Sequence, residues 1–222
     1  MSACMPRMDA VGAHPGRRSI AAQRHFSVRR AIGESGWWRL PAAIRERFAD
    51  DVAGAEYVGS FDIVRASTAG RLLALLCRII GTPIAPYTGH DVPASVRVFS
   101  DGRGGMVWER TYRFSPRRTC VVSSTKVADQ DGRLVETLPA GLRMQLAVYE
   151  LRGTLNFVSR GYFFRRLGLA IRVPDFLPPG RTHVVHQDEG NGWFRFTMTV
   201  THPLFGEMFY QTGRFRAAGE QS

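Results

Sequence analysis

The feature that most constrains the fold is a long series of short segments in which apolar and polar residues alternate. From about residue 92 onward, turn sequences separate these segments, among them Asp101-Gly102, Asp131-Gly132 and Gly190-Asn191-Gly192. Alternation with a period of two is typical of strands that bury one face. The sequence therefore predicts strands at residues 56–65, 94–100, 105–114, 118–127, 133–138, 142–158, 181–188, 193–201 and 205–216.

The predicted order of these strands favours one curved sheet. Consecutive strands joined by short turns pair antiparallel, and a sheet of about 8–10 such strands tends to curl into a barrel or cup. Within residues 142–158 the alternation changes phase, which indicates a bulge or turn at Gly153. Because Gly102-Arg103-Gly104-Gly105 lies between two strands, it predicts a hairpin turn and not a phosphate-binding loop.

Two short helices are predicted near the N-terminus. Residues 40–48 have Pro41 at the start of the helix, and residues 68–80 have Thr68 as a cap and Gly81 with Pro83 at the end. The second helix carries a broad leucine-rich face, so we expect it to cover the opening of the sheet. An alternative is that this face touches a membrane surface or a lipid. The fold class is thus mainly β (α+β), a cup or barrel of about 8–10 strands with two short helices.

Charge and targeting signals set the expected domain boundaries and location. The formal net charge is +11, and residues 1–30 hold six arginines against one acid. We expect a basic, disordered tail at residues 1–28, a single β-rich domain at 29–217 and a short tail at 218–222. The basic tail has no apolar core of a secretory signal, and the chain has no apolar run long enough to span a membrane. We expect a cytoplasmic protein that can associate with a membrane.

Residue usage argues against several function classes. Of the 30 basic residues, 29 are arginine, which is typical of coding bias from a GC-rich genome and a weak sign of nucleic-acid binding. The three cysteines lack the spacing of metal ligands or of a redox pair, and His183 and His186 point to opposite faces of a strand. Motifs for phosphate, dinucleotide or metal binding and for hydrolysis are missing from the sequence. We expect no metal and no cofactor.

The informative residues are charged side chains within apolar stripes. Arg110 shares a strand face with Trp108 and Tyr112, and Glu136 shares one with Leu134 and Leu138. If these faces point inward, both charges are interior and need partners. One interpretation is a buried pair that fixes strand register. The other is a polar anchor in an apolar pocket, in which Arg110 binds a carboxylate or phosphate.

The order of several segments also resembles a known family. The segments are Leu40-Pro41, the leucine-rich helix ending at Gly81-Thr82-Pro83, Trp108-x-Arg110, Glu136 and the Phe194-Arg195-Phe196 strand. In this order they resemble the bacterial domain-of-unknown-function 4166 family over about residues 31–217. The resemblance implies a domain found alone or attached to membrane proteins and dehydrogenase-like enzymes, and it implies no established activity or catalytic residues.

Three functional hypotheses follow from the sequence. The first is a non-enzymatic domain that binds a small hydrophobic or amphipathic ligand, with Arg110 at its anionic end and Glu136 orienting Arg110. Its pocket would be lined by Trp108, Tyr112, Phe194 and Phe196. The second is an enzyme in the same cavity, with Glu136 or His186 as general base. The third is binding of an anionic lipid surface or nucleic acid through the N-terminal tail, with helix 68–80 as a further membrane contact.

Overall fold

A computed structural model describes most of the chain. It covers residues 26–219, apart from 53, 79–84, 86, 116–117, 130, 139–140, 167–168, 175–177 and 179. The predicted tails at 1–28 and 218–222 and the predicted helix end at Gly81 and Pro83 therefore lie largely outside the described residues. Phe26 and Val28 are described, and both are buried in the core.

The described part of the chain is built mainly from strands. Its helices are α2 (Val28–Arg39), α3 (Ala42–Arg47) and α4 (Thr68–Arg78). Its strands are β1 (Gly54–Ala66), β2 (Gly89–Ser100), β3 (Met106–Ser115), β4 (Arg118–Ala128), β5 (Leu134–Thr137), β6 (Leu142–Leu151), β7 (Thr154–Arg166), β8 (Leu169–Val173), β9 (Arg181–Gly190), β10 (Trp193–His202) and β11 (Gly206–Ala217).

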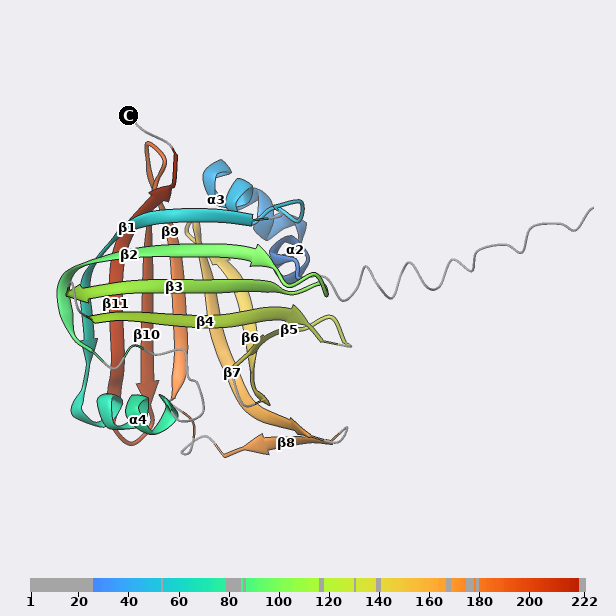
Figure 1. The fold of residues 1–222 in the computed structure, drawn as a ribbon. Coiled ribbons are helices and arrows are strands. Elements are labelled where there is room, and N and C mark those ends of the chain that lie inside the picture. The colour runs from blue at the N-terminus through green and yellow to red at the C-terminus, as the bar shows by residue number, and fades with distance from the viewer. Residues whose placement is uncertain are drawn as a thin grey trace, which may run out of the picture.

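The strands form a closed antiparallel barrel (Figure 1). The order around the sheet is β6-β5-β4-β3-β2-β1-β11-β10-β9-β7, and β6 also pairs with β7, which closes the ring. β8 pairs with the C-terminal part of β7, beyond the residues of β7 that pair with β9, and does not belong to the ring. The predicted fold class is confirmed, and the sheet closes.

The turn between β6 and β7 makes this closure possible. Arg152 and Gly153 both adopt positive φ, of 50° and 77°, so the chain reverses where the sequence pattern changes phase. Glu150 accepts a hydrogen bond from the Gly153 backbone at 2.9 Å and pairs with Arg39 of α2 at 2.5 Å. The single segment predicted at 142–158 is therefore two strands of one hairpin.

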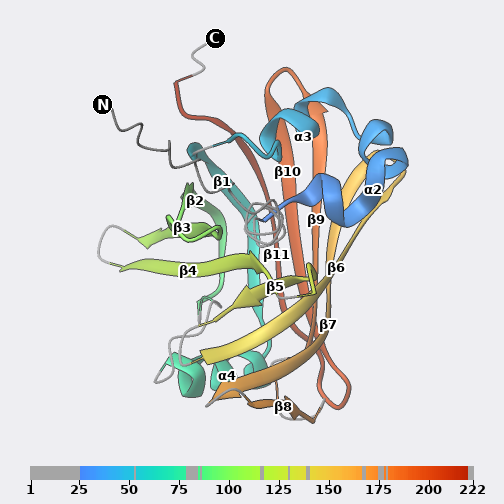
Figure 2. The same cartoon turned by 90° about the vertical axis from the view of Figure 1, so that its right-hand side faces the viewer.

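The helices lie at different ends of the barrel (Figure 2). α3 starts after Pro41 as predicted. α4 packs on β11 and β1, and its cap is Ser67 and not Thr68, since the Ser67 hydroxyl accepts a hydrogen bond from the Gly70 backbone at 3.0 Å. No helix among the described residues is both long enough and apolar enough to cross a membrane.

Helix α2 was not predicted from the sequence. Ser27 caps it by accepting a hydrogen bond from the Arg30 backbone at 3.1 Å. Gly33 has a φ of 73° and interrupts the helical geometry, which weakens the periodic signal in the sequence. The helix buries Trp37 against the barrel, and α2 packs on β6.

The buried residues that the structure describes form two apolar clusters. The first joins the helical residues Val28, Trp37 and Ile44 to strands β3, β5, β6 and β7. The second is centred on Phe61 and contains Tyr112, which stacks on Phe61 at a centroid distance of 5.0 Å. Within the second cluster, the Tyr112 hydroxyl donates to Oε1 of fully buried Gln211 at 3.0 Å.

Replacing Tyr112 by Phe tests this buried hydrogen bond. The variant leaves Oε1 of Gln211 without its donor in the core, and we expect the free energy of unfolding to fall by about 1–3 kcal/mol. Urea unfolding followed by fluorescence measures this change. Tyr149→Phe is the control, because Tyr149 is 37% exposed, and it should behave like the wild type. A wild-type midpoint for Tyr112→Phe would contradict this assignment.

Candidate functional site

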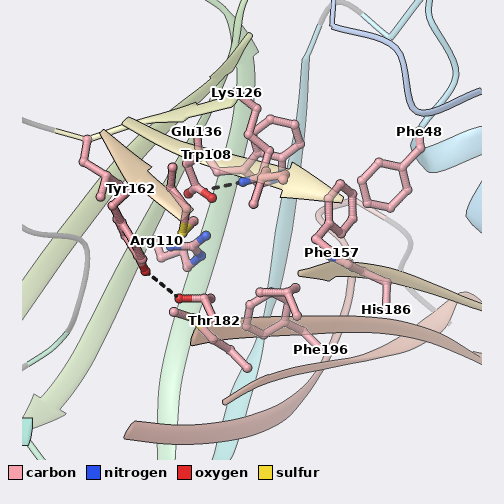
Figure 3. Close-up of a pocket in the computed structure, with 15 residues that line it drawn as sticks. Phe48, Trp108, Arg110, Lys126, Glu136, Phe157, Tyr162, Thr182, His186 and Phe196 are labelled. Atoms are coloured by element: carbon pink, nitrogen blue, oxygen red, sulfur yellow. Dashed lines mark hydrogen bonds and ion pairs between the residues drawn. The ribbon is translucent and has the colours of Figure 1, made fainter. Parts of the chain in front are cut away.

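The barrel interior contains a cavity with a mixed lining, here called the inner cavity (Figure 3). Its volume is about 50 Å³, counted as the space open to the centre of a water molecule. One water needs about 10–15 Å³ on this measure, so the space suits a few waters or a small ligand. The residues that line it are Phe48, Trp108, Arg110, Lys126, Glu136, Leu138, Met144, Leu146, Phe157, Tyr162, Thr182, Val184, His186, Phe196 and Met198.

A second cavity of about 40 Å³, here called the side cavity, adjoins the inner cavity. The two share Phe48, Trp108, Arg110, His186 and Phe196. Arg47 and Phe194 line the side cavity. Because Arg110 and His186 line both spaces, they lie at the junction of the two.

Strand alternation places the polar groups inside. On β3, the residues Trp108, Arg110 and Tyr112 are all buried, as their shared strand face predicted. On β4 and β5, Lys126 and Glu136 are direct cross-strand partners. In an antiparallel pair such opposite residues have neighbouring side chains, so the register of this hairpin brings the two charges together.

Glu136 forms its ion pair with Lys126 and not with Arg110. The Lys126 Nζ lies 3.4 Å from Glu136 Oε1, and both side chains are at least nine-tenths buried. The predicted pairing of Arg110 with Glu136 is therefore replaced, because the register of β4 and β5 places Lys126 next to the carboxylate. Arg110 acts on Glu136 only through its charge.

The two partners have shifted pKa values. Burial alone would raise the pKa of Glu136, but the positive charges of Lys126 and Arg110 outweigh it and hold this pKa below its ordinary value. Burial lowers the pKa of Lys126, Glu136 opposes that change, and the charge of Arg110 adds to it. Glu136 is thus ionised, and Lys126 loses its proton more easily than a solvated lysine does.

Arg110 is buried without a matching acid. Among the described residues it forms no hydrogen bond and no ion pair; its guanidinium carbon lies 5.7 Å from the Phe196 ring centroid. Arg47 is half-buried, with its guanidinium carbon 3.7 Å from the Phe194 ring centroid. Its Nη1 has no hydrogen-bond partner in the described structure, and burial lowers its pKa. Of the described residues that line the two cavities, only Glu136 is acidic.

His186 lies in a cage of aromatic rings. Its ring centroid is 5.0 Å from that of Phe48 and 5.3 Å from that of Phe196. Burial, together with the charges of Arg47, Lys126 and Arg110, lowers its pKa well below 6.5. Its Nδ1 is buried and has no hydrogen-bond partner among the described residues. The imidazole is therefore neutral in the folded protein.

Tyr162 and Thr182 supply hydroxyl groups on another side of the inner cavity. The Tyr162 hydroxyl donates to the Gly180 carbonyl at 2.8 Å and lies 3.3 Å from Thr182 Oγ1. Burial raises the pKa of Tyr162 to about 12, so this phenol is neutral and remains a hydrogen-bond donor.

The structure brings most of the predicted site residues together. Trp108, Arg110, Glu136 and Phe196 line the inner cavity, and Phe194 lines the side cavity. Tyr112 lines neither cavity, because it packs between Phe61 and Phe114 and bonds to Gln211. Within the described residues, no three His, Cys, Asp or Glu side chains gather in a way that could hold a metal ion.

Three residues that line the inner cavity were not predicted as site residues from the sequence. Lys126 carried a signal, since it is the only lysine in the chain and shares the inward face of its strand with Val122 and Ser124. Phe48 carried a partial signal, since it and Ile44 are the apolar positions of the predicted helix at 40–48. Tyr162 carried none, because its inward direction depends on how β7 meets the rest of the barrel.

The fold and the site define a closed antiparallel barrel with a small, positively charged interior. The family model described as "Domain of unknown function (DUF4166)" matches residues 40–215. The chain belongs to this family. No curated protein and no solved structure matches the chain.

The buried neutral His186 predicts a loss of stability in mild acid. The unfolded chain binds a proton at this histidine below about pH 6.5, whereas the folded protein does not. The stability that the neutral His186 contributes to the free energy of unfolding is therefore fully present above that pH and is lost as the pH falls. From about pH 7 to about pH 5, we expect the free energy of unfolding to fall by about 1–2 kcal/mol more in the wild type than in His186→Phe.

Urea unfolding at the two pH values measures this difference. His90→Gln, at an exposed position on β2, is the matched control and should keep the wild-type dependence. Equal pH dependence in the wild type and His186→Phe would show that His186 does not remain neutral on folding.

Proposed function

We propose that the barrel binds a small amphipathic ligand whose anionic group meets Arg110. The observation that carries this proposal is the unmatched charge of Arg110. It is buried at the junction of the two cavities, and among the described residues no side chain pairs with it. A buried charge without a partner is costly, and a carboxylate or phosphate would supply two hydrogen-bond acceptors in the geometry that a guanidinium prefers.

The charge balance of the interior supports an anion over a neutral ligand. Glu136 is already paired with Lys126, so it does not neutralise Arg110 as well. Arg47, whose Nη1 is buried, adds a further guanidinium at the side cavity. An incoming anion would therefore lower the electrostatic free energy of Arg110, Lys126 and Arg47, which line cavities whose described residues include one carboxylate, that of Glu136.

The rest of the lining supports an apolar body for the ligand. Trp108, Phe157 and Phe196 present ring surfaces to the inner cavity, together with aliphatic and thioether side chains. Pockets that combine an apolar wall with a few converging polar groups are typical of small-molecule sites. The volume of about 50 Å³ favours a compact ligand over a long acyl chain.

Phenylacetate and benzyl alcohol are suitable probes because they share an aromatic ring and differ in charge. We expect wild-type protein to bind phenylacetate more tightly than benzyl alcohol by isothermal titration calorimetry. Arg110→Met should weaken phenylacetate binding by about tenfold to a hundredfold, the value of a charge-assisted hydrogen bond. It should leave the free energy of unfolding unchanged or higher, since an unpaired buried charge is removed.

Arg97→Met is the matched control, because Arg97 lies on the neighbouring strand β2 and its side chain is exposed. It should bind both probes like the wild type. Solvent extraction of the purified protein, followed by mass spectrometry, tests for a ligand that is retained from the cell. Equal binding of both probes, or wild-type binding by Arg110→Met, would contradict the role of Arg110.

The enzyme hypothesis and the membrane hypothesis stay predictions. The first gains a neutral His186 and an ionised Glu136 in one cavity, as a general base would need. For the membrane hypothesis, Leu72 of α4 is exposed, as are Leu204 and Phe205 in the turn between β10 and β11. The N-terminal tail, through which the chain would bind an anionic lipid surface or nucleic acid, lies largely outside the described residues.

A further inference from the structure

The chain contains a single lysine, and that lysine lies inside the barrel. The other 29 of its 30 lysine and arginine residues are arginine. Lys126 is 7% exposed and lines the inner cavity. An ion pair that only stabilised the fold could equally use arginine, whose planar fork matches a carboxylate better than an ammonium does. The property that arginine lacks is the ability to become a neutral amine.

The surroundings of Lys126 suit an amine that reacts. Its Nζ lies 4.3 Å from the centroid of the Trp108 ring and 3.4 Å from the Glu136 carboxylate (Figure 3). Arg110 lines the same cavity and adds a second positive charge. A lysine becomes nucleophilic when it is desolvated in an apolar site or placed near another cation, and here both conditions hold.

We propose that Lys126 forms an imine with the carbonyl group of a small oxo acid whose carboxylate is bound by Arg110. The inference rests on the proposed function for the carboxylate contact with Arg110. It adds the second functional group of the ligand, a ketone or aldehyde, and gives the Lys126–Glu136 pair a chemical role.

The step is balanced with the groups present. The Lys126 ammonium passes one proton to Glu136, and the nitrogen lone pair forms the C–N bond while the C=O π electrons move to oxygen. The oxygen takes one proton from nitrogen and one from Glu136, the C–O bond breaks, and water leaves. The nitrogen keeps its last proton, so the products are a protonated imine, the Glu136 carboxylate and one water.

Trapping with glyoxylate and sodium cyanoborohydride tests this proposal. Glyoxylate is a small aldehyde that carries a carboxylate, and the hydride reduces an imine to a stable carboxymethyl amine. In this 222-residue chain, Lys126 and the α-amino group are the available amines, so the α-amino group serves as an internal reference. We expect peptide mapping by mass spectrometry to show Lys126 reacting at least about tenfold faster than the α-amino group.

Two variants and one further probe separate the parts of the proposal. Lys126→Arg keeps the charge beside Glu136 and should remove the interior label while the protein stays folded. Arg110→Met should slow the labelling of Lys126 by glyoxylate about tenfold or more. The same variant should not slow labelling by acetaldehyde, which has no carboxylate. The peptide map of the wild type decides the question even if a variant fails to fold.

The outcomes distinguish the two proposals. Labelling confined to the α-amino group, with phenylacetate still bound through Arg110, would overturn the imine and leave the proposed function standing. Labelling of Lys126 at the same rate in the wild type and Arg110→Met would overturn the carboxylate contact. Labelling of Lys126 that is fast, selective for glyoxylate and dependent on Arg110 supports both.

Discussion

The backbone pairing between β6 and β7 is the interaction on which the interior depends, because it turns a long sheet into a closed barrel. Closure places the inward faces of β3, β4, β5 and β9 around one space lined by buried side chains. In such a space, charges interact more strongly than they do in water. The ion pair of Lys126 with Glu136, the unmatched Arg110 and the neutral His186 all owe their properties to this enclosure.

Strand periodicity was sufficient to place Arg110 and Glu136 in the interior, because side chains on a strand alternate between two faces. It could not give the partner of Glu136. That depends on the hairpin between β4 and β5, which is closed by hydrogen bonds between Asp129 and Arg133. A two-residue turn at Asp131-Gly132 would have set Lys126 opposite residue 137, and a shift of one residue reverses the face of every side chain.

Residue usage misled the sequence interpretation at one position. The excess of arginine was assigned to coding bias, and Lys126 was counted only as the exception. The structure shows that the exception lies beside the predicted Glu136 and in the same cavity as Arg110. Helix α2 was missed for a different reason: the positive φ of Gly33 breaks its periodicity, and its stability comes from packing on β6.

The position of β8 outside the ring has a consequence for self-association. A closed barrel has no free strand edge, but β8 pairs with β7 alone and so leaves one backbone edge unpaired within the described structure. Such an edge is a template on which another chain can add a strand. β8 has five residues and is followed by Pro174, which lacks a backbone donor. Pairing with another molecule at this edge would extend over only a short ladder.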